Sequence, residues 1–173
     1  MAHTCVNNGG QKSIVRFARV PQLDEEVLLS PEAFAALAYW QPRVGEVVTL
    51  LDPEDTAYRA RITTLDAESC SCLPFQRVNR PVESLLQVEL YQAIPDKERF
   101  ELVLQKLTEL GVSRIVAMES ERSMTIDERD LRQKKSHRWP DVIVRAAKQC
   151  RRAMLPELRT GLSFSEVVAS TSA

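Results

Sequence analysis

The amino-acid sequence predicts a two-domain protein, with an α+β domain built on a small β-barrel followed by an incomplete α/β domain. Short runs with an apolar period of two occur within residues 46–78, as is typical of the strands of a small barrel. From residue 85 onward, strand-like and helix-like runs alternate, which predicts a parallel sheet with helical crossovers. The 173 residues, 44% of them hydrophobic, can form one large core or two small ones.

The first domain is expected to span residues 13–84. Residues 1–12 are polar and predict a disordered leader, because they cannot bury enough apolar surface to offset the entropy lost on ordering. A first strand is expected over residues 14–20. Ser30 and Pro31 then form the start signal of a short helix that Pro42 ends.

Three further strands are expected in this domain, over residues 47–51, 58–64 and 70–75, separated by the turn residues of 52–55 and 66–68. Residues 79–84, which include Pro81, are expected to be a linker.

The second domain is expected to span residues 85–173. Apolar residues over 86–93 predict a strand, and those at helical spacing after Pro95 predict a helix that Gly111 ends. A strand is expected over residues 115–118. A second apolar stripe from Trp139 to Cys150 predicts another helix, with Pro140 in its first turn.

Composition excludes several classes of protein. No apolar run reaches the roughly 18 residues of a membrane helix, and the N-terminus has no signal-peptide pattern, so a cytoplasmic protein without a membrane partner is expected. The four cysteines are expected to be reduced, and two histidines give no metal-ligand set. Although the net charge is −1, residues 129–159 carry ten Lys or Arg against three Asp or Glu. This basic segment indicates either a surface that faces a polyanion or a solvated helix face.

One segment carries a specific motif. Residues 96–111, DKERFELVLQKLTELG, resemble the family segment K-x-x-x-x-E-x-x-x-Q-K-x-x-E-L-G, and further matches follow in order at 120–123, 138–139, 146–152 and 156–157. The chain therefore resembles the bacterial 16S rRNA uridine N3-methyltransferase family. That resemblance implies a PUA-like RNA-binding barrel, a SPOUT methyltransferase domain that is closed by a knot, S-adenosylmethionine as the methyl donor, and a homodimer. It also implies the small ribosomal subunit as partner and a role in rRNA processing and ribosome biogenesis.

The chain departs from the family pattern at several positions. Ala35 and Gln41 stand where the family has a histidine and an arginine, and Arg145 and Lys148 stand where it has two acidic residues. The glycine-rich and Leu-Arg loops that form the donor site in the family do not occur in the sequence. We therefore expect this chain to bind no S-adenosylmethionine and to be inactive on its own. The sequence assigns no catalytic residue.

Six residues are candidates for RNA binding. Arg145, Lys148 and Arg152 lie at helical spacing and predict a cationic stripe, and Gln149 is expected to share a helix face with Arg152. Arg122 follows a predicted sheet strand, where α/β proteins place ligands. Arg16 stands beside Phe17 and matches the Arg-Phe pair with which the family begins.

Two other classes of function stay open. The basic segment and the absent donor loops suit a non-catalytic RNA-binding module, whose RNA affinity should fall with salt. The loss of an arginine at Gln41 and an open sheet edge suit an inactive fragment or a dimerisation piece.

Overall fold

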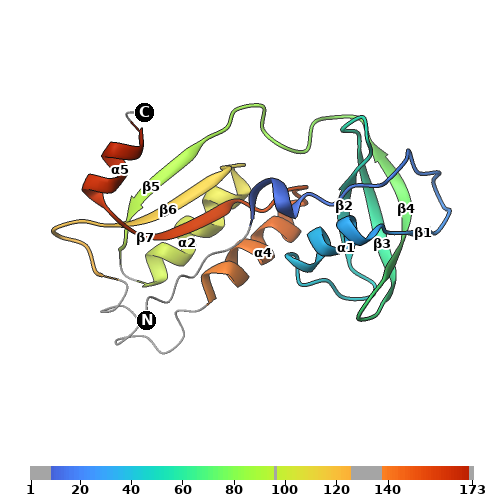
Figure 1. The fold of residues 1–173 in the computed structure, drawn as a ribbon, viewed down its shortest axis with the longest axis horizontal. Coiled ribbons are helices and arrows are strands. Elements are labelled where there is room, and N and C mark those ends of the chain that lie inside the picture. Colours follow the sequence, from blue (N-terminus) through green and yellow to red (C-terminus); the bar gives the residue numbers. More distant parts are fainter. Residues whose placement is uncertain (1–8, 96, 126–137, 172–173) are drawn as a thin grey trace. The chain divides into compact units, whose positions relative to one another are not determined.

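The computed structural model describes residues 9–95, 97–125 and 138–171, and it divides into two compact units (Figure 1). Unit 1 contains the described residues of Leu86–Ala146 and Pro156–Ala173. Unit 2 contains Gly9–Leu85 together with Ala147–Leu155. Each unit is described by itself.

Unit 2 is built on an antiparallel sheet with the strand order β1-β4-β3-β2. Its strands are β1 (Val27–Leu28), β2 (Val47–Leu51), β3 (Ala57–Leu65) and β4 (Cys70–Val78). The expected strands at 47–51, 58–64 and 70–75 are therefore confirmed, with β3 and β4 longer than expected. The two-residue β1 carries no sequence signal and was not predicted.

A closed barrel is not confirmed. In the described residues β1 pairs only with β4 over two residues, and the free side of β2 makes one isolated bridge, between Leu51 and Arg16. A full strand was expected over residues 14–20, but only this one bridge forms there. The chain bends before Pro21, and proline has no N–H to donate to a neighbouring strand. Val15 and Phe17 nevertheless bury their side chains.

The start of the chain is ordered earlier than the expected leader boundary at residue 12. Gly10–Ser13 forms a 3-10 helix, and Gly10 N donates to Leu155 O at 2.7 Å. The expected leader otherwise lies in residues 1–8, outside the described residues. Helix α1 (Pro31–Ala38) begins as predicted, because Ser30 Oγ accepts a hydrogen bond from Ala33 N at 3.3 Å.

Residues 147–155 complete the core of unit 2, although they lie far from the rest of it in the sequence. Ala153 packs with Leu51 and Ala57, and all three are buried. Leu155 N donates to the buried Ser13 Oγ at 2.9 Å. The segment therefore supplies both apolar contacts and backbone hydrogen bonds to the first part of the chain.

Unit 1 is built on a parallel sheet with the order β5-β6-β7 (Figure 1). Its strands are β5 (Glu89–Ala93), β6 (Arg114–Glu119) and β7 (Glu157–Ser163). The first two confirm the predicted strands and their parallel pairing. The third was not predicted.

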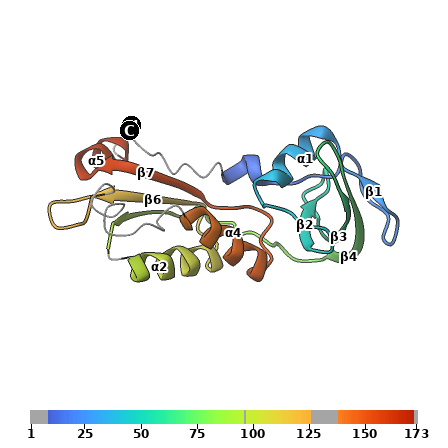
Figure 2. The same cartoon turned by 90° about the horizontal axis from the view of Figure 1, so that it is seen from below.

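The helices of unit 1 are α2 (Lys97–Glu109), α4 (Trp139–Cys150), which continues into unit 2 at Ala147, and α5 (Phe164–Thr171). In Figure 2, α2 and the beginning of α4 lie on one face of the sheet. Phe100 and Trp139 pack there with ring centroids 4.3 Å apart, and both are buried. Gly111 ends the turn after α2 with a φ of 87°, as its residue type predicts.

Candidate nucleic-acid interface

Arg122 lies at the carboxyl edge of the parallel sheet, three residues after the end of β6. The turn that carries it is closed by Ser120 and Ser123, because Ser120 N donates to Ser123 Oγ at 2.8 Å. Arg122 is exposed, and within the described part of the chain it makes no ion pair or hydrogen bond. It is therefore placed where an α/β sheet meets ligands, with its guanidinium available.

Arg145 lies on the exposed side of α4, opposite the buried residues Ile143 and Ala147. Its Nε donates to Asp141 O at 3.3 Å, one turn earlier in the helix. Gln149 is also exposed on this helix. Both side chains thus face solvent as expected, Arg145 from unit 1 and Gln149 from unit 2.

Lys148 is held inside unit 2 by contacts with the loop before β2. Its Nζ donates to Glu46 Oε2 at 2.7 Å and to Gln41 O at 3.1 Å. Gln41 and Lys148 both depart from the family pattern, and the structure brings them together at this contact. The positive charge at residue 148 is thus paired with Glu46, and 23% of the lysine side chain is exposed.

Arg152 does not share a helix face with Gln149. Helix α4 ends at Cys150, and Arg151 adopts a left-handed conformation with a φ of 61°, which turns the chain away from the helical path. Only 4% of the side chain of Arg152 is exposed, and its Nε and Nη2 donate to Glu83 Oε2 at 3.0 and 2.7 Å. The expected cationic stripe therefore ends at Lys148, because residue 152 lies past the helix and in the core.

Arg16 pairs with acidic and carbonyl groups at the surface of unit 2. Its Nη2 lies 2.8 Å from Asp55 Oδ1, and its Nη1 donates to Asp52 O at 3.3 Å. The neighbouring Phe17 is 3% exposed and packs edge-on against Tyr58, with ring centroids 6.1 Å apart. Arg16 can meet a phosphate because such an exposed pair is weak, but Phe17 cannot stack on a base.

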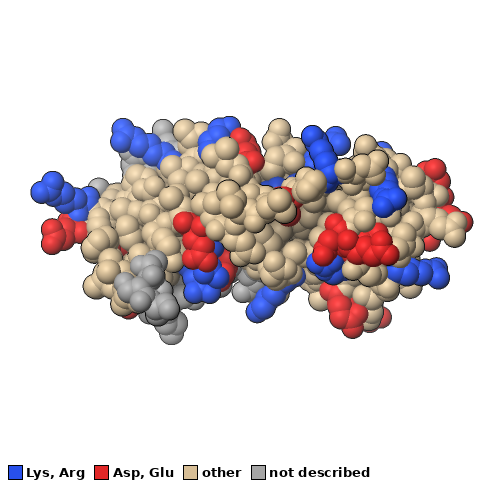
Figure 3. Space-filling view, turned by 90° about the horizontal axis from the view of Figure 1, so that it is seen from above, with Lys and Arg blue, Asp and Glu red and all other residues tan. Residues whose placement is uncertain are grey.

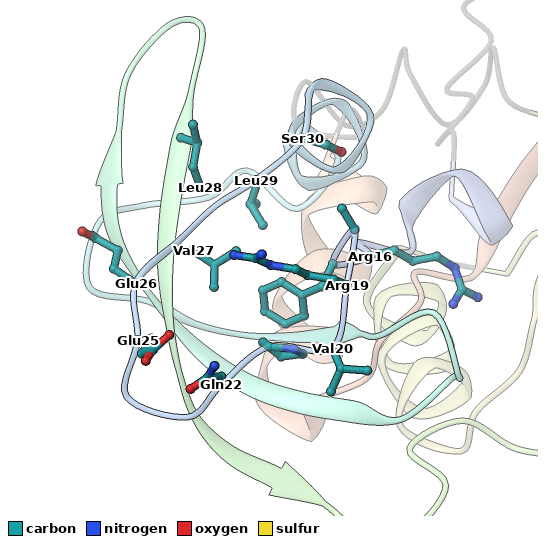
Figure 4. A pocket seen from close by; sticks show the side chains of 13 residues that line it. Arg16, Arg19, Val20, Gln22, Glu25, Glu26, Val27, Leu28, Leu29 and Ser30 are labelled. Carbon is teal, nitrogen blue, oxygen red and sulfur yellow. The ribbon is translucent and has the colours of Figure 1, made fainter.

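A pocket of about 490 Å³ opens within residues 16–30 of unit 2 (Figure 4). Figure 4 shows Arg19 extending across this pocket toward Val27, whereas Arg16 extends the other way. Arg19 is exposed and makes no ion pair or hydrogen bond in the described part of the chain. Arg19 was not predicted from the sequence, which carries no signal for it, because three positions after Arg16 on an expected strand falls on the opposite face.

Positive charge does not gather in a single patch on the face drawn in Figure 3. Lys and Arg side chains there lie beside Asp and Glu side chains. The six predicted residues are likewise divided, with Arg122 and Arg145 in unit 1 and the other four in unit 2. The six predicted residues therefore do not belong to one continuous stripe on a single unit.

Other kinds of site find no support in the described residues. No group of three His, Cys, Asp or Glu side chains there is placed to hold a metal ion. Cys70 and Cys72 are free and buried, and Cys150 is half-buried. Among the described helices, none combines the length and the hydropathy that crossing a membrane requires.

Residues 82–173 match the family model described as an RNA methyltransferase domain, which is more than half of the chain. The chain belongs to this RNA methyltransferase family. Similar proteins include the ribosomal RNA small subunit methyltransferase E of Bacillus subtilis (strain 168), 23% identical over 72% of this chain and 48% of that protein. The protein of the same name from Aquifex aeolicus (strain VF5) is 27% identical over 66% of this chain and 49% of that protein.

Solved structures are similar over most of the chain. The ribosomal RNA small subunit methyltransferase E of Neisseria gonorrhoeae, bound to S-adenosyl methionine, is 27% identical, with a TM-score of 0.53 over 90% of this chain and 65% of that chain. A methyltransferase structure from Legionella pneumophila, in complex with SAM, is 30% identical, with a TM-score of 0.54 over 90% of this chain and 66% of that chain. The chain spans about half the length of the curated relatives it matches.

Proposed function

We propose that this chain is the RNA-recognition unit and the first part of the catalytic domain of a methyltransferase that acts on 16S rRNA. The observation that carries the proposal is the match of residues 82–173 to the RNA methyltransferase domain, over a segment that includes the whole parallel sheet. The similar proteins from Bacillus subtilis and Aquifex aeolicus bear the name of a small-subunit rRNA methyltransferase. The small ribosomal subunit is accordingly the proposed partner.

The proposed reaction is transfer of a methyl group to N3 of a uridine. This specificity rests on the motif at residues 96–111 and its ordered downstream matches. Uracil N3 carries an imide proton, which must be removed before or during attack on the methyl group. None of the described residues is assigned this role.

The residues present do not by themselves fit S-adenosylmethionine. At the carboxyl edge of the sheet, Ser163 N and Oγ both donate to Glu166 Oε2 at 2.7 Å, and these hydrogen bonds lower the pKa of Glu166. Ser120 and Ser123 are bonded to each other in the same way. These polar groups are therefore already paired, and we derive no step through the methyl donor.

RNA would be held by separate cationic contacts in this proposal. Arg122 and Arg145 supply exposed guanidinium groups in unit 1, and Arg19 supplies one in unit 2. Arg16 and Gln149 add a weakly paired cation and an amide. Lys148 and Arg152 act through Glu46 and Glu83 as positioning residues that hold the segment after α4.

A homodimer is also proposed, on the resemblance to the family. The parallel sheet supports it, since β5 and β7 are its two edges among the described strands and an edge can pair with another chain.

A non-catalytic RNA-binding module is the second candidate function. The exposed guanidinium groups of Arg19 and Arg122, which have no partner among the described residues, favour it, because contact with phosphate requires positive charge but no site for a methyl donor. An inactive fragment has no comparable observation in its favour.

Two titrations of the purified chain test the proposal. We expect binding to 16S rRNA that weakens as salt rises, and no heat with S-adenosylmethionine. Micromolar binding of the donor would show that this chain holds its own donor site. Equal affinity for 16S rRNA at low and high salt would contradict the proposed RNA contacts.

A further inference from the structure

The pocket of unit 2 has an apolar interior (Figure 4). Phe17 and Leu29 line it and are buried, and Figure 4 shows Val27 and Leu29 pointing inward. Its volume of about 490 Å³ lies within the range of roughly 300–1,000 Å³ that is usual for small-molecule sites. The pocket is therefore of a size and a polarity that suit one flat heterocyclic ring.

The backbone on both sides of the pocket is fixed to the sheet of unit 2. On one side, Phe17 N donates at 2.8 Å to the carbonyl of the last residue of β2. On the other side, Asp24 N and Leu29 N donate to carbonyls of β4 at 2.7 and 2.9 Å. Because the walls are held in place by these bonds, a ligand need not order them when it binds.

The rim of the pocket carries polar side chains of both kinds. Arg19 extends across it, and Gln22 and Glu25 stand on the loop at its lower edge in Figure 4. All three are exposed and have no hydrogen bond or ion pair among the described residues. A guanidinium only donates hydrogen bonds and a carboxylate only accepts them. The rim thus offers a donor fork and an acceptor pair to the same ligand.

A purely structural role explains only the interior of the pocket. Packing of Phe17 and Leu29 against the core requires their apolar side chains. It requires neither Arg19 nor Glu25, which carry opposite charges, line the same pocket and form no ion pair with each other. An apolar interior with a few polar groups at its edge is the usual composition of a ligand-binding pocket.

The charges around the pocket favour a neutral ligand over a phosphate group. Two arginines and two glutamates line it, so neither sign is in excess. Arg16 points away in Figure 4 and pairs with Asp55, and Glu26 accepts a hydrogen bond from Thr63 Oγ1. One guanidinium and one carboxylate stay available. A phosphate would be attracted by the first and repelled by the second, whereas a ring with separate acceptor and donor edges can bind both.

We infer that this pocket takes a guanine base from a single-stranded stretch of RNA. Guanine presents O6 and N7 as a pair of acceptors, which suit the fork of Arg19. It also presents its N1–H and its 2-amino group side by side, and two adjacent donor groups are what the carboxylate of Glu25 can accept. The other three RNA bases have no such pair of donor groups. Bases in single strands are unstacked and are read in this way by proteins. The choice of RNA as the source of the base rests on the proposed function.

The test compares the wild-type chain with the double variant Arg19→Gln/Glu25→Gln. The matched control is Arg43→Gln/Glu68→Gln, which also removes one charge of each sign from two exposed residues of unit 2, outside the pocket. GMP, AMP, CMP and UMP are titrated into each full chain, and the backbone amides of residues 16–30 are followed by nuclear magnetic resonance. The four nucleotides share one phosphate group, so any difference between them comes from the base. Affinity for 16S rRNA is then measured against salt.

We expect GMP to shift these amides in the wild-type and control chains and to bind about tenfold more tightly than the other three nucleotides. The Arg19 and Glu25 variant should lose this preference. It should also bind 16S rRNA more weakly than the control does, with an unchanged slope of log Kobs against log salt, because a contact with a base releases no counterion.

Two results would overturn the inference and leave the proposed function standing. The first is equal binding of all four nucleotides by a wild-type chain that binds 16S rRNA in a salt-dependent way. The second is a preference for GMP that survives in the variant while its salt slope falls by about 0.7 to 0.9, which would make Arg19 a phosphate contact. Binding of GMP in the pocket without any binding of 16S rRNA would overturn RNA as the source of the base, and the proposed function would fail with it.

Discussion

Burial decides which arginines of this chain can meet a ligand. Arg122 and Arg152 both belong to segments that match the family, and the sequence predicts RNA binding for both. In the structure Arg122 is exposed, whereas 4% of the side chain of Arg152 is exposed and the guanidinium is fixed by Glu83. Glu83 Oε1 also accepts from Ala153 N at 2.7 Å and from Met154 N at 3.0 Å. The Glu83 carboxylate therefore binds three successive residues, 152–154, of the segment that follows α4.

The substitution Glu83→Gln is expected to destabilise the chain by about 3 kcal/mol, because it removes the carboxylate that pairs with the buried Arg152. Urea unfolding measures this loss. Asp55→Asn is the matched control, since it breaks the exposed pair with Arg16 and should cost less than about 1 kcal/mol. A loss at residue 83 no larger than at residue 55 would show that Arg152 is not held by this pair.

Cys72 should make the chain less stable in alkali. Burial raises the pKa of its thiol to about 12, with smaller effects from Cys70 and Glu26. Because the pKa of the thiol in the folded chain lies above its unfolded value of 9.0, the stability that Cys72 contributes is complete below pH 9 and is lost as pH rises toward 12. Equilibrium unfolding measured from pH 8 to about 10.5 should show a steeper loss of stability above pH 9 for wild type than for Cys72→Ala. Parallel curves for the two proteins would refute this assignment.

At the level of elements, an ion-pair network joins the three strands of the parallel sheet at one end. Arg114 on β6 contacts Glu89 on β5 at 2.5 Å and Glu157 on β7 at 2.8 Å. Arg159 contacts the other oxygen of Glu157 at 2.7 Å. This network ties β7 to the two strands that the sequence did predict.

Protonation of Glu157 is expected to weaken the sheet. Burial alone would raise the pKa of this carboxyl, but hydrogen bonds from Arg114 and Arg159 hold it below the ordinary value of 4.5. The stabilisation is therefore present above pH 4.5 and is lost as pH falls through the lower folded pKa. Stability measured from pH 6 down to about 3 should fall more steeply for wild type than for Glu157→Gln, and equal slopes would contradict the network.

The elements that the sequence predicts are those with a strong period or a clear end signal. Helix α4 repeats its apolar residues at helical spacing, and Ser30 and Gly111 mark helix ends. Strand β7 has no such signal, because ELRTGLS mixes charged residues with Gly161 and is stabilised by pairing with β6. Strand β7 forms because it pairs with a strand distant in the sequence, and a local pattern cannot predict that pairing.

The candidate site was predictable only in part, for a related reason. Sequence spacing gives the exposure of Arg145 and Gln149 on α4, because a regular helix fixes which face each residue takes. Sequence spacing gives the wrong position for Arg152, because the left-handed backbone of Arg151 ends the helix before that residue. It also cannot show that Arg59 of β3 contacts the carbonyl of Arg151, since these residues come from separate segments.

At the scale of the whole molecule, unit 2 is not a continuous stretch of sequence. Unit 2 contains residues 9–85, and the segment 147–155 that completes their core lies far beyond the expected domain boundary at residue 84. Without that segment, Glu83 loses Arg152 and Ser13 loses its bond from Leu155 N. A structural unit of this chain is therefore assembled from separate stretches of its sequence.

A shortened chain of residues 9–85 is accordingly expected to be much less stable than the same residues in the full chain. It exposes the apolar face that Ala153 covers on Leu51 and Ala57, and it leaves buried polar groups unpaired. Circular dichroism during heating and limited proteolysis measure the difference. A cooperative transition at the temperature of the full chain would show that residues 147–155 are dispensable.

We propose above that this member of the RNA methyltransferase family holds 16S rRNA through separate cationic contacts. Filter binding of the full chain to 16S rRNA across a range of salt concentrations tests it most directly, with Arg122→Gln/Arg145→Gln beside the wild type. The account predicts that log Kobs falls linearly with log salt and that the double variant binds more weakly with a shallower slope. An affinity that neither salt nor the two substitutions change would contradict it.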